Sequence, residues 1–391
     1  MSAILSSHLP KVTPVSSLPQ PRGSLVMVIT ELDEGGAEKA FVRIACGLKT
    51  LGWAVQVISL RDAGRLAEPL QNCGIPVTAL NAHGPAAMLT LPRLTSILRR
   101  IRPDVVFSFL HEANLMTRVA GWLAGICCRV CSVRVVDRRP LVTVPERLTQ
   151  RLVTHFIACS ESVASEHAYL CGIPPSKISV IRNGVDVDTL QRIPPLPRSD
   201  LGLAADDFVV LMAGRLTRQK SPHLLLQAFE QLQRQSHPRR IRLLIAGEGP
   251  ERDRLSGLAA TLPDPAAVCF LGWRSDLANL MKTADLFVLP SAWEGLPNVL
   301  LEAQASGLPV AATAVDGCMD VIRPGVTGQL FPPNNPGEIA RLIADQLHDP
   351  GPAATMAAAA LQGLRTTGRW EACIDECDRV LMELCRGSKA G

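Results

Sequence analysis

Two glutamates, Glu294 and Glu302, stand eight positions apart, on either side of a Gly-Leu-Pro turn. They follow an apolar run at 284–289 that is typical of a strand, and Pro297 lies where a helix can begin without needing its missing N–H. Backbone N–H groups at a helix start favour an anion such as phosphate. At roughly 1.5 Å of rise per residue, the second carboxylate lies about two turns further on. The arrangement predicts a nucleotide-sugar site, with Glu294 at a sugar hydroxyl and Glu302 at a second hydroxyl pair.

Carboxylates also gather at helix starts because they suit the helix dipole, so the glutamate pair alone leaves a purely structural role open. A second cluster supports the ligand site. The segment Gly214-Arg-Leu-Thr-Arg-Gln-Lys220 follows the apolar run 208–213 and precedes Pro222 at another helix start. Arg215 can grip phosphate oxygens with its planar fork, while Lys220 adds a point charge. The two cations predict a diphosphate site that needs no metal ion.

The composition bounds the class of protein. A length of 391 residues exceeds one ordinary core and predicts two domains. The formal charge is only +4, and aromatic residues make up 4% of the chain, so surfaces for stacking bases are scarce and a nucleic-acid binder is not expected. Twelve cysteines are scattered through apolar stretches, which indicates reduced thiols in the cytoplasm. The spacing of Cys128 and Cys131 is better explained by a buried strand than by zinc.

The first 22 residues contain four prolines among serines and have no unbroken apolar centre, so we expect a disordered tail rather than a signal peptide. No run reaches the roughly 18 uninterrupted apolar residues of a membrane-spanning helix. The apolar segment 115–128 is interrupted by Arg118.

Apolar runs alternate with amphipathic segments from Leu25 onward, which predicts an α/β fold with parallel sheets covered on both faces. A proline-rich stretch at 192–200 is interpreted as a linker between an N-terminal domain at 23–191 and a C-terminal domain at 201–365. We expect the helical end at 366–391 to cross back to the first domain. Two doubly wound, Rossmann-like domains that face each other would place a ligand cleft between the carboxyl ends of their sheets.

The expected strands of the first domain lie at 25–29, 54–60, 77–80, 105–109, 131–135, 155–159 and 178–181. Those of the second lie at 208–213, 241–246, 268–271, 284–289, 309–313 and 328–331.

The sequence resembles the retaining glycosyltransferases of family 4, which have the GT-B fold. The resemblance extends over nearly the whole chain, from Gly35-Gly-Ala-Glu38 through Asn183-Gly-Val-Asp186 to Gly325-Val-Thr-Gly328. Its most specific part is the motif with Glu294 and Glu302. The resemblance implies transfer of a sugar from a nucleotide sugar with retention of the anomeric configuration, and without a metal or other cofactor.

In that family an arginine and a lysine bind the nucleotide diphosphate, and the resemblance assigns these roles to Arg215 and Lys220. Glu294 would contact the donor sugar as a catalytic residue, and Glu302 would bind the ribose hydroxyls. Arg274 would lie by the base. The other residues assigned to the donor site belong to the same turns and are Gly214, Gly295, Leu296 and Asn298.

Gly35 and Gly36 predict a first strand-to-helix turn in which the backbone can approach the donor phosphates or the acceptor. His111 follows another strand of the first domain, in Ser108-Phe-Leu-His-Glu-Ala-Asn114. Many family members place a histidine there against the transferred sugar, so the resemblance implies a catalytic role for His111. A loop histidine without such a role is the alternative.

Eleven arginines but only four acidic residues lie between Arg93 and Arg151. In the family the first domain binds the acceptor. Such a patch could hold the protein at an anionic membrane surface or receive a polyprenyl-diphosphate-linked acceptor, each cation near the surface contributing about 1 kcal/mol. Ordinary solvated helix faces are the alternative. We expect Arg138 and Arg139 to contact the acceptor directly.

The sequence thus predicts a cytoplasmic glycosyltransferase, peripheral on the inner face of the plasma membrane. It would move a hexose or N-acetylhexosamine from a UDP- or GDP-linked donor to a saccharide acceptor that is lipid-linked. The product would be a surface polysaccharide such as lipopolysaccharide or exopolysaccharide. Two alternatives are a catalytically silent scaffold subunit of the same fold and a GT-B nucleotide-sugar epimerase.

Overall fold

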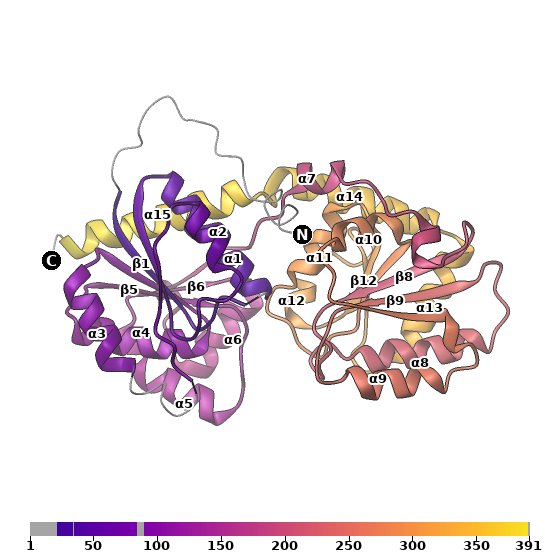
Figure 1. Cartoon of the computed structure of the whole chain (residues 1–391), viewed down its shortest axis with the longest axis horizontal. Helices are drawn as coiled ribbons and strands as arrows, with labels where there is room; N and C mark the ends of the chain where they lie inside the picture. Colours follow the sequence, from indigo (N-terminus) through magenta and orange to yellow (C-terminus); the bar gives the residue numbers. More distant parts are fainter. Residues whose placement is uncertain (1–21, 34, 84–89, 390–391) are drawn as a thin grey trace. The chain divides into compact units, whose positions relative to one another are not determined.

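The computed structural model describes residues 22–33, 35–83 and 90–389 (Figure 1), so the tail expected at the N-terminus lies outside the described residues up to residue 21. The chain forms two compact units. The first contains the chain up to Gly184 together with Trp370 and the residues after it, and the second runs from Val185 to Arg369. Within the described part of the chain, no helix is both long and apolar enough to cross a bilayer.

The first unit is built on a seven-stranded parallel sheet in the order β3-β2-β1-β4-β5-β6-β7. Its strands are β1 (Gly23–Ile29), β2 (Trp53–Ser59), β3 (Val77–Ala79), β4 (Val105–Phe109), β5 (Cys128–Val133), β6 (His155–Ala158) and β7 (Ile178–Val180). Its helices are α1 (Gly36–Thr50), α2 (Ala67–Asn72), α3 (Thr90–Ile101), α4 (His111–Leu123), α5 (Pro140–Thr149), α6 (Glu161–Cys171) and α15 (Trp370–Lys389).

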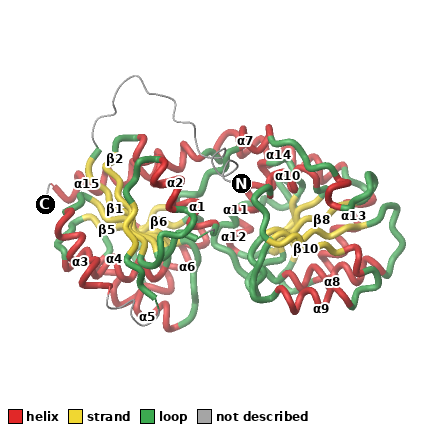
Figure 2. Tube along the Cα trace, in the orientation of Figure 1, coloured by secondary structure: helices red, strands yellow, loops and turns green. Residues whose placement is uncertain are grey.

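Helices cover both faces of this sheet, as Figure 2 shows. Leu25, Met27 and Ile29 of β1 belong to the core shared with α1 and α15. Val26 and Val28, which alternate with them, belong to the core shared with α3 and α4. Because successive strand residues point to opposite faces, a strand covered on both sides is apolar throughout, which is the pattern that the sequence shows.

The second unit is built on a six-stranded parallel sheet in the order β10-β9-β8-β11-β12-β13. Its strands are β8 (Phe208–Ala213), β9 (Ile241–Ala246), β10 (Val268–Gly272), β11 (Leu286–Leu289), β12 (Val310–Thr313) and β13 (Gln329–Phe331). Its helices are α7 (Val187–Arg192), α8 (Pro222–Gln233), α9 (Arg252–Ala260), α10 (Leu277–Thr283), α11 (Asn298–Ala305), α12 (Asp316–Met319), α13 (Pro336–His348) and α14 (Gly351–Thr367). Both sheets reverse their strand order beside the first strand of the unit, which is the doubly wound topology expected from the sequence.

Every expected strand is present, and β4, β8 and β9 have the expected bounds. The predicted bounds of β5, 131–135, were wrong, because the strand begins at Cys128 and ends at Val133. Cys128 is fully buried in the core, whereas Val135 is exposed. Both Cys128 and Cys131 therefore lie inside one buried strand. Among the described residues there is no cluster of three or more side chains suited to hold a metal ion.

The proline-rich stretch at 192–200 differs from the linker that the sequence suggested. The boundary between the units lies after Gly184. The stretch itself packs on the second unit, where the Leu196 N–H donates to Thr283 Oγ1 at 2.8 Å and Arg198 pairs with Asp285 at 2.9 Å. Proline prevents regular structure here but does not prevent packing, so composition alone misplaced the boundary.

Helix α15 belongs to the first unit although the second unit precedes it in the chain. Its Cys377 and Leu381 are buried in the core that contains α1. Gly47 of α1 leaves room for Ile374, since a Cβ there would overlap that side chain. The indole Nε1 of Trp53 donates to the buried Asp378 at 2.7 Å.

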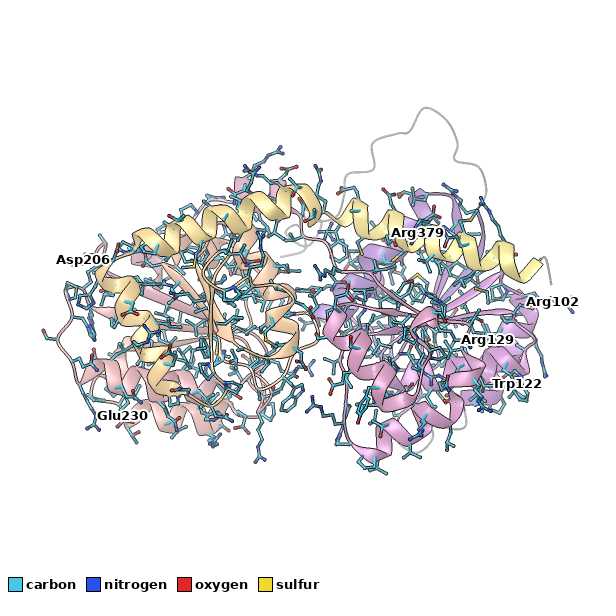
Figure 3. All side chains as sticks on the ribbon, turned by 180° about the vertical axis from the view of Figure 1, so that it is seen from behind. Arg102, Trp122, Arg129, Asp206, Glu230 and Arg379 are labelled. Atoms are coloured by element: carbon cyan, nitrogen blue, oxygen red, sulfur yellow. The ribbon has the colours of Figure 1, made fainter. Side chains whose placement is uncertain are left out.

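We predict that Trp53→Phe lowers the free energy of unfolding of the first unit by about 1–3 kcal/mol, because the buried Asp378 carboxylate loses its indole donor. The measurement is the calorimetric Tm of the full chain. Trp122→Phe is the matched control, because Trp122, labelled in Figure 3, lies at the surface with 55% of its area exposed. Equal losses in the two variants would show that the hydrogen bond to Asp378 is not what matters.

Candidate functional site

Two loops of the second unit carry the residues predicted for the donor. One follows β8 and contains Gly214, Arg215 and Lys220, and the other follows β11 and contains Glu294. Strands β8 and β11 are neighbours and parallel, so their carboxyl ends lie at the same edge of the sheet. The loops are joined by hydrogen bonds, since the Ala292 N–H donates to the Gln219 carbonyl at 2.7 Å.

Lys220 and Glu294 form an ion pair at this edge, between Nζ and Oε1. The Glu294 side chain is only 5% exposed, and its Oε1 also accepts a hydrogen bond from Ser291 Oγ at 2.6 Å. A buried carboxylate needs such partners, because an unpaired charge away from water is strongly destabilising. The sequence predicts both residues in one site, each at a separate ligand group, and only the structure shows that they pair.

Arg215 stands in the same loop as Lys220 with its side chain exposed, and no ion pair involves it among the residues that the structure describes. Arg274 follows β10 and is held by Asp276 through two hydrogen bonds of 2.8 and 2.6 Å. The predicted donor residues thus come from loops at one edge of one sheet. Glycine 295 and Leu296 lie in the loop after β11, Asn298 begins α11, and Glu302 lies half-buried on that helix.

Glycines set the close packing of these loops. Gly247, directly after β9, has a φ of +140°, and a Cβ on it would overlap the carbonyl oxygen of Gly214. Gly249 makes a similar approach to the backbone of Leu216. Behind the other loop, Gly317 of α12 leaves room for the backbone of Gly295. These contacts explain why glycine is needed there and identify a positioning role that sequence reasoning did not assign to Gly317.

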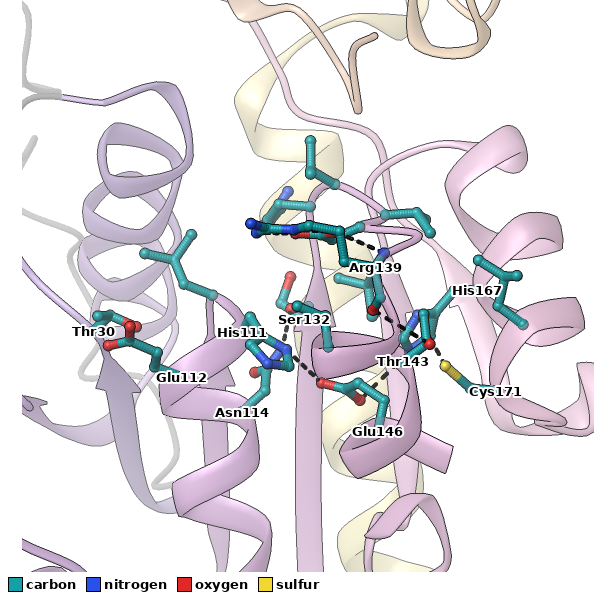
Figure 4. A pocket seen from close by; sticks show the side chains of 18 of the residues that line it. Thr30, His111, Glu112, Asn114, Ser132, Arg139, Thr143, Glu146, His167 and Cys171 are labelled. Atoms are coloured by element: carbon teal, nitrogen blue, oxygen red, sulfur yellow. Dashed lines mark hydrogen bonds and ion pairs between the residues drawn. The ribbon is translucent and has the colours of Figure 1, made fainter. Parts of the chain in front are cut away.

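The first unit contains a pocket of about 400 Å³ at the carboxyl ends of β1, β4 and β5 (Figure 4). Its lining includes polar and charged side chains together with apolar ones from α5 and β5. The polar and charged residues that line it are Thr30, Glu31, Arg61, His111, Glu112, Asn114, Ser132, Arg134, Asp137, Arg139, Thr143, Glu146 and His167. The structure therefore brings the predicted His111 and Arg139 into one pocket.

His111 is the first residue of α4, and its side chain is 36% exposed. The preceding Leu110 has φ 71° and ψ 153°, a region that is close to exclusive to glycine and costs of order 1–3 kcal/mol for other residues. Packing of Leu110 against the apolar core holds it there. The Nδ1 atom of His111 lies 3.0 Å from Oε1 of Glu146 on α5.

Glu146 is buried and was not recognised from the sequence. Its Oε2 lies 2.7 Å from Nη2 of Arg118 on α4, a side chain that is itself buried. Burial works against the Glu146 carboxylate, but the hydrogen bond from His111 and the charge of Arg118 outweigh it, so the pKa of Glu146 lies below its usual range. His167 on α6 lies 3.9 Å from the same oxygen, and burial lowers the pKa of His167.

A signal for this cluster was present in the sequence. Arg118 is the charged residue that interrupts an apolar helical segment, and it stands two turns after His111 on the same helix. A buried arginine requires an acidic partner, and that requirement points to a nearby carboxylate such as Glu146.

Each predicted arginine of this region has an acidic partner, and Arg138 and the two glycines are not among the residues that line the pocket. Arg138 forms an ion pair with Glu166, and Arg139 is held by Asp137 at 2.9 Å. The hydrogen bond from Arg139 is the main reason why the pKa of Asp137 is lowered. Gly35 caps the start of α1 and Gly36 is its first residue, and neither is among the residues that line the pocket.

Comparison with known proteins gives two matches to family models. Residues 197–362 match glycosyl transferases group 1, and residues 34–189 match Glycosyltransferase Family 4. A D-inositol 3-phosphate glycosyltransferase of Thermobispora bispora is 33% identical over 87% of this chain and 88% of the relative. An Escherichia coli UDP-Gal:alpha-D-GlcNAc-diphosphoundecaprenol alpha-1,3-galactosyltransferase is 30% identical, and there the match spans 62% of this chain and 66% of that relative, just under two thirds of its length.

Solved structures show the same fold. Anabaena HepE, crystallised with UDP and with UDP-glucose, superposes with a TM-score of 0.80 over 92% of this chain and 100% of HepE, at 23–24% identity. The lipopolysaccharide outer core galactosyltransferase WaaB in its apo form superposes with a TM-score of 0.70 over 94% of this chain and 99% of WaaB, at 18% identity.

We predict that Gly247→Ala displaces the loop after β8, because the added methyl group meets the Gly214 carbonyl in a backbone conformation that alanine rarely adopts. The second unit should lose at least about 1–3 kcal/mol of stability. Calorimetry and hydrogen exchange of the amides at 214–221 measure the effect. Gly257→Ala on α9 is the control, since a Cβ there meets nothing within 4 Å and alanine favours a helix. Unchanged exchange in the Gly247 variant would disprove the packing role.

Proposed function

This chain belongs to the group 1, or family 4, glycosyltransferases with the GT-B fold, and we propose that it is an active, retaining transferase of a hexose or N-acetylhexosamine. The observation that carries this proposal is the partly buried Lys220–Glu294 pair, with the exposed Arg215 in the same loop as Lys220, where the ends of β8 and β11 meet. A silent scaffold would place no demand on Arg215 and Lys220 to meet a departing diphosphate.

On the donor side, Arg215 and Lys220 would contact the diphosphate, Glu294 a sugar hydroxyl and Glu302 the ribose. Breaking the anomeric bond leaves additional negative charge on the diphosphate, and fixed cations stabilise that charge as it develops. The two cations make a metal ion or other cofactor unnecessary in this proposal. Lys220 would then be shared between Glu294 and the phosphate. The Gly214, Gly295, Leu296 and Asn298 backbone would lie along the phosphates and sugar, with Arg274 by the base.

We propose UDP rather than GDP as the nucleotide of the donor. HepE was crystallised with UDP and with UDP-glucose, and the name of the Escherichia coli relative specifies UDP-Gal. The same relative acts on GlcNAc-diphosphoundecaprenol. We therefore propose a saccharide linked to a polyprenyl diphosphate as the acceptor, with its sugar in the pocket at His111 and its diphosphate toward Arg139. The product would be a surface polysaccharide such as lipopolysaccharide or exopolysaccharide, and Gly35-Gly36 would approach the phosphates or acceptor.

A lipid-linked acceptor requires access to a membrane, and α5 supplies a surface for it. Leu141, Val144 and Leu148 recur at helical spacing on this helix and are exposed, Leu141 by 89% and Leu148 by 76%. We call these three residues the α5 apolar ridge. Arg147 and Arg151 lie beside it, and neither has an acidic partner among the described residues. An apolar ridge flanked by cations suits an anionic bilayer, so we propose a peripheral location on the inner face of the plasma membrane.

The donor proposal predicts that UDP or a UDP sugar raises the Tm of the wild type. At a ligand concentration of 100 times Kd, binding should add about 2.7 kcal/mol to the free energy of unfolding. Arg215→Ala should weaken this binding about tenfold or more, because a charge-assisted hydrogen bond contributes about 1.5–3 kcal/mol. Arg218→Ala, in the same loop and highly exposed, is the control and should bind the nucleotide normally.

Glu294→Ala should lose sugar transfer, while Glu230→Ala, on the surface of α8, should keep it. No shift with UDP, GDP or ADP sugars would favour the silent scaffold.

The membrane proposal predicts that the double variant Leu141→Gln/Leu148→Gln binds phosphatidylglycerol vesicles at least about tenfold more weakly than the wild type, because two apolar side chains no longer enter the bilayer. Vesicle sedimentation measures the partition. Leu258→Gln, an exposed leucine of α9 in the second unit, is the control. Unchanged binding of the double variant, or equal wild-type binding to neutral phosphatidylcholine vesicles, would contradict this surface.

A further inference from the structure

Glu146 divides its two carboxylate oxygens between two partners on α4. Oε2 faces the buried guanidinium of Arg118 at 2.7 Å. Oε1 faces Nδ1 of His111 at 3.0 Å, as Figure 4 shows. The glutamate comes from the inner side of α5, and its side chain is 5% exposed. One end of this chain of contacts is therefore buried, and the other end is a half-exposed histidine that lines the pocket.

An ion pair that only supported packing would be complete with Arg118 and Glu146. Arg118 already balances the charge of the carboxylate and is held by further bonds, from Nε to the Asn114 carbonyl at 3.2 Å and from Nη1 to Thr149 Oγ1 at 3.0 Å. The second oxygen of Glu146 is thus available as a hydrogen-bond acceptor for His111. A carboxylate only accepts, so the proton in this hydrogen bond belongs to Nδ1 of the ring.

We propose that Glu146 is a positioning residue for His111. It accepts the Nδ1 proton, fixes the ring and leaves Nε2 as the nitrogen that faces the pocket with its lone pair. There Nε2 accepts a hydrogen bond from a hydroxyl of a bound sugar. This inference rests on the transferase function proposed above, to which it adds a residue that no motif in the sequence identified. The strained backbone of Leu110 supports the same reading, because it fixes the position from which the ring starts.

The first test is spectroscopic and needs neither donor nor acceptor. In full-length protein with ¹⁵N-labelled histidine, long-range proton–nitrogen correlations of His111, assigned by comparison with His111→Ala, should show Nδ1 protonated and Nε2 bare at a pH where the ring is neutral. Glu146→Gln should shift the population toward the other tautomer, since the amide can donate as well as accept. A wild-type ring with its proton on Nε2 would overturn the proposal, whatever the enzyme transfers.

The second test is a double-mutant cycle on sugar transfer. Glu146→Gln should lower kcat about tenfold with little change in the KM of the donor, because a misplaced ring loses its hydrogen bond to the sugar hydroxyl in the transition state. In a His111→Ala background the same substitution should have no further effect. An equal loss in both backgrounds would show that Glu146 acts through the fold alone.

Two further variants keep the cycle interpretable. Glu146→Asp retains a carboxylate for Arg118 but shortens the reach to His111, so it should fold normally and still lower kcat; full activity in it would overturn the proposal. Glu161→Gln, an exposed acid at the start of α6, is the control for charge removal. Failure of the transferase function would appear separately, as absence of any UDP-sugar shift in the wild type, while the tautomer of His111 would still decide the role of Glu146.

Discussion

A carboxylate that leaves water needs a cation beside it, and each unit of this protein has such a pair at the carboxyl edge of its sheet. In the second unit Lys220 and Glu294 connect the loop after β8 with the loop after β11. In the first unit Arg118 and Glu146 connect α4 with α5. Elsewhere the sheets are covered by apolar cores on both faces. The first pair therefore fixes two loops where regular structure ends, and the second fixes two helices against each other beside the pocket.

The fold could be predicted from the sequence because the strands of a parallel sheet covered on both faces are continuous apolar runs. The prediction was wrong where a residue in a strand is charged, or where an irregular segment is packed. Arg129 interrupts the apolar run of β5, so the sequence predicts a strand that begins three residues too late. The Arg129 side chain bonds backbone carbonyls such as that of Leu152 and is therefore compatible with the strand. The prolines of 192–200 likewise indicated correctly that α7 could not continue, but they carried no information on which unit the segment packs against.

The site could be predicted only as far as local motifs extend. Glu294 and Lys220 belong to short motifs, whereas their ion pair depends on two strands being neighbours. Glu146 stands next to Arg147 in the sequence and resembles a solvated helical residue, so only the third dimension shows that it is buried against α4. Counting charges along the chain overestimates how many cations lack an acidic partner. Arg138 looked like a free cation, but Glu166 of α6 meets it in space.

Because α15 lies at the end of the chain, the first unit is completed only after the second unit has been synthesised. The second unit is complete in sequence once Arg369 has been made, while the first unit still lacks the helix that covers one side of α1. Domains of most multidomain chains fold in the order in which they leave the ribosome. Here the unit that is begun first is finished last, and its α1 face stays uncovered while the intervening 185–369 segment is translated. A chaperone that binds apolar surface would have its longest opportunity at this face.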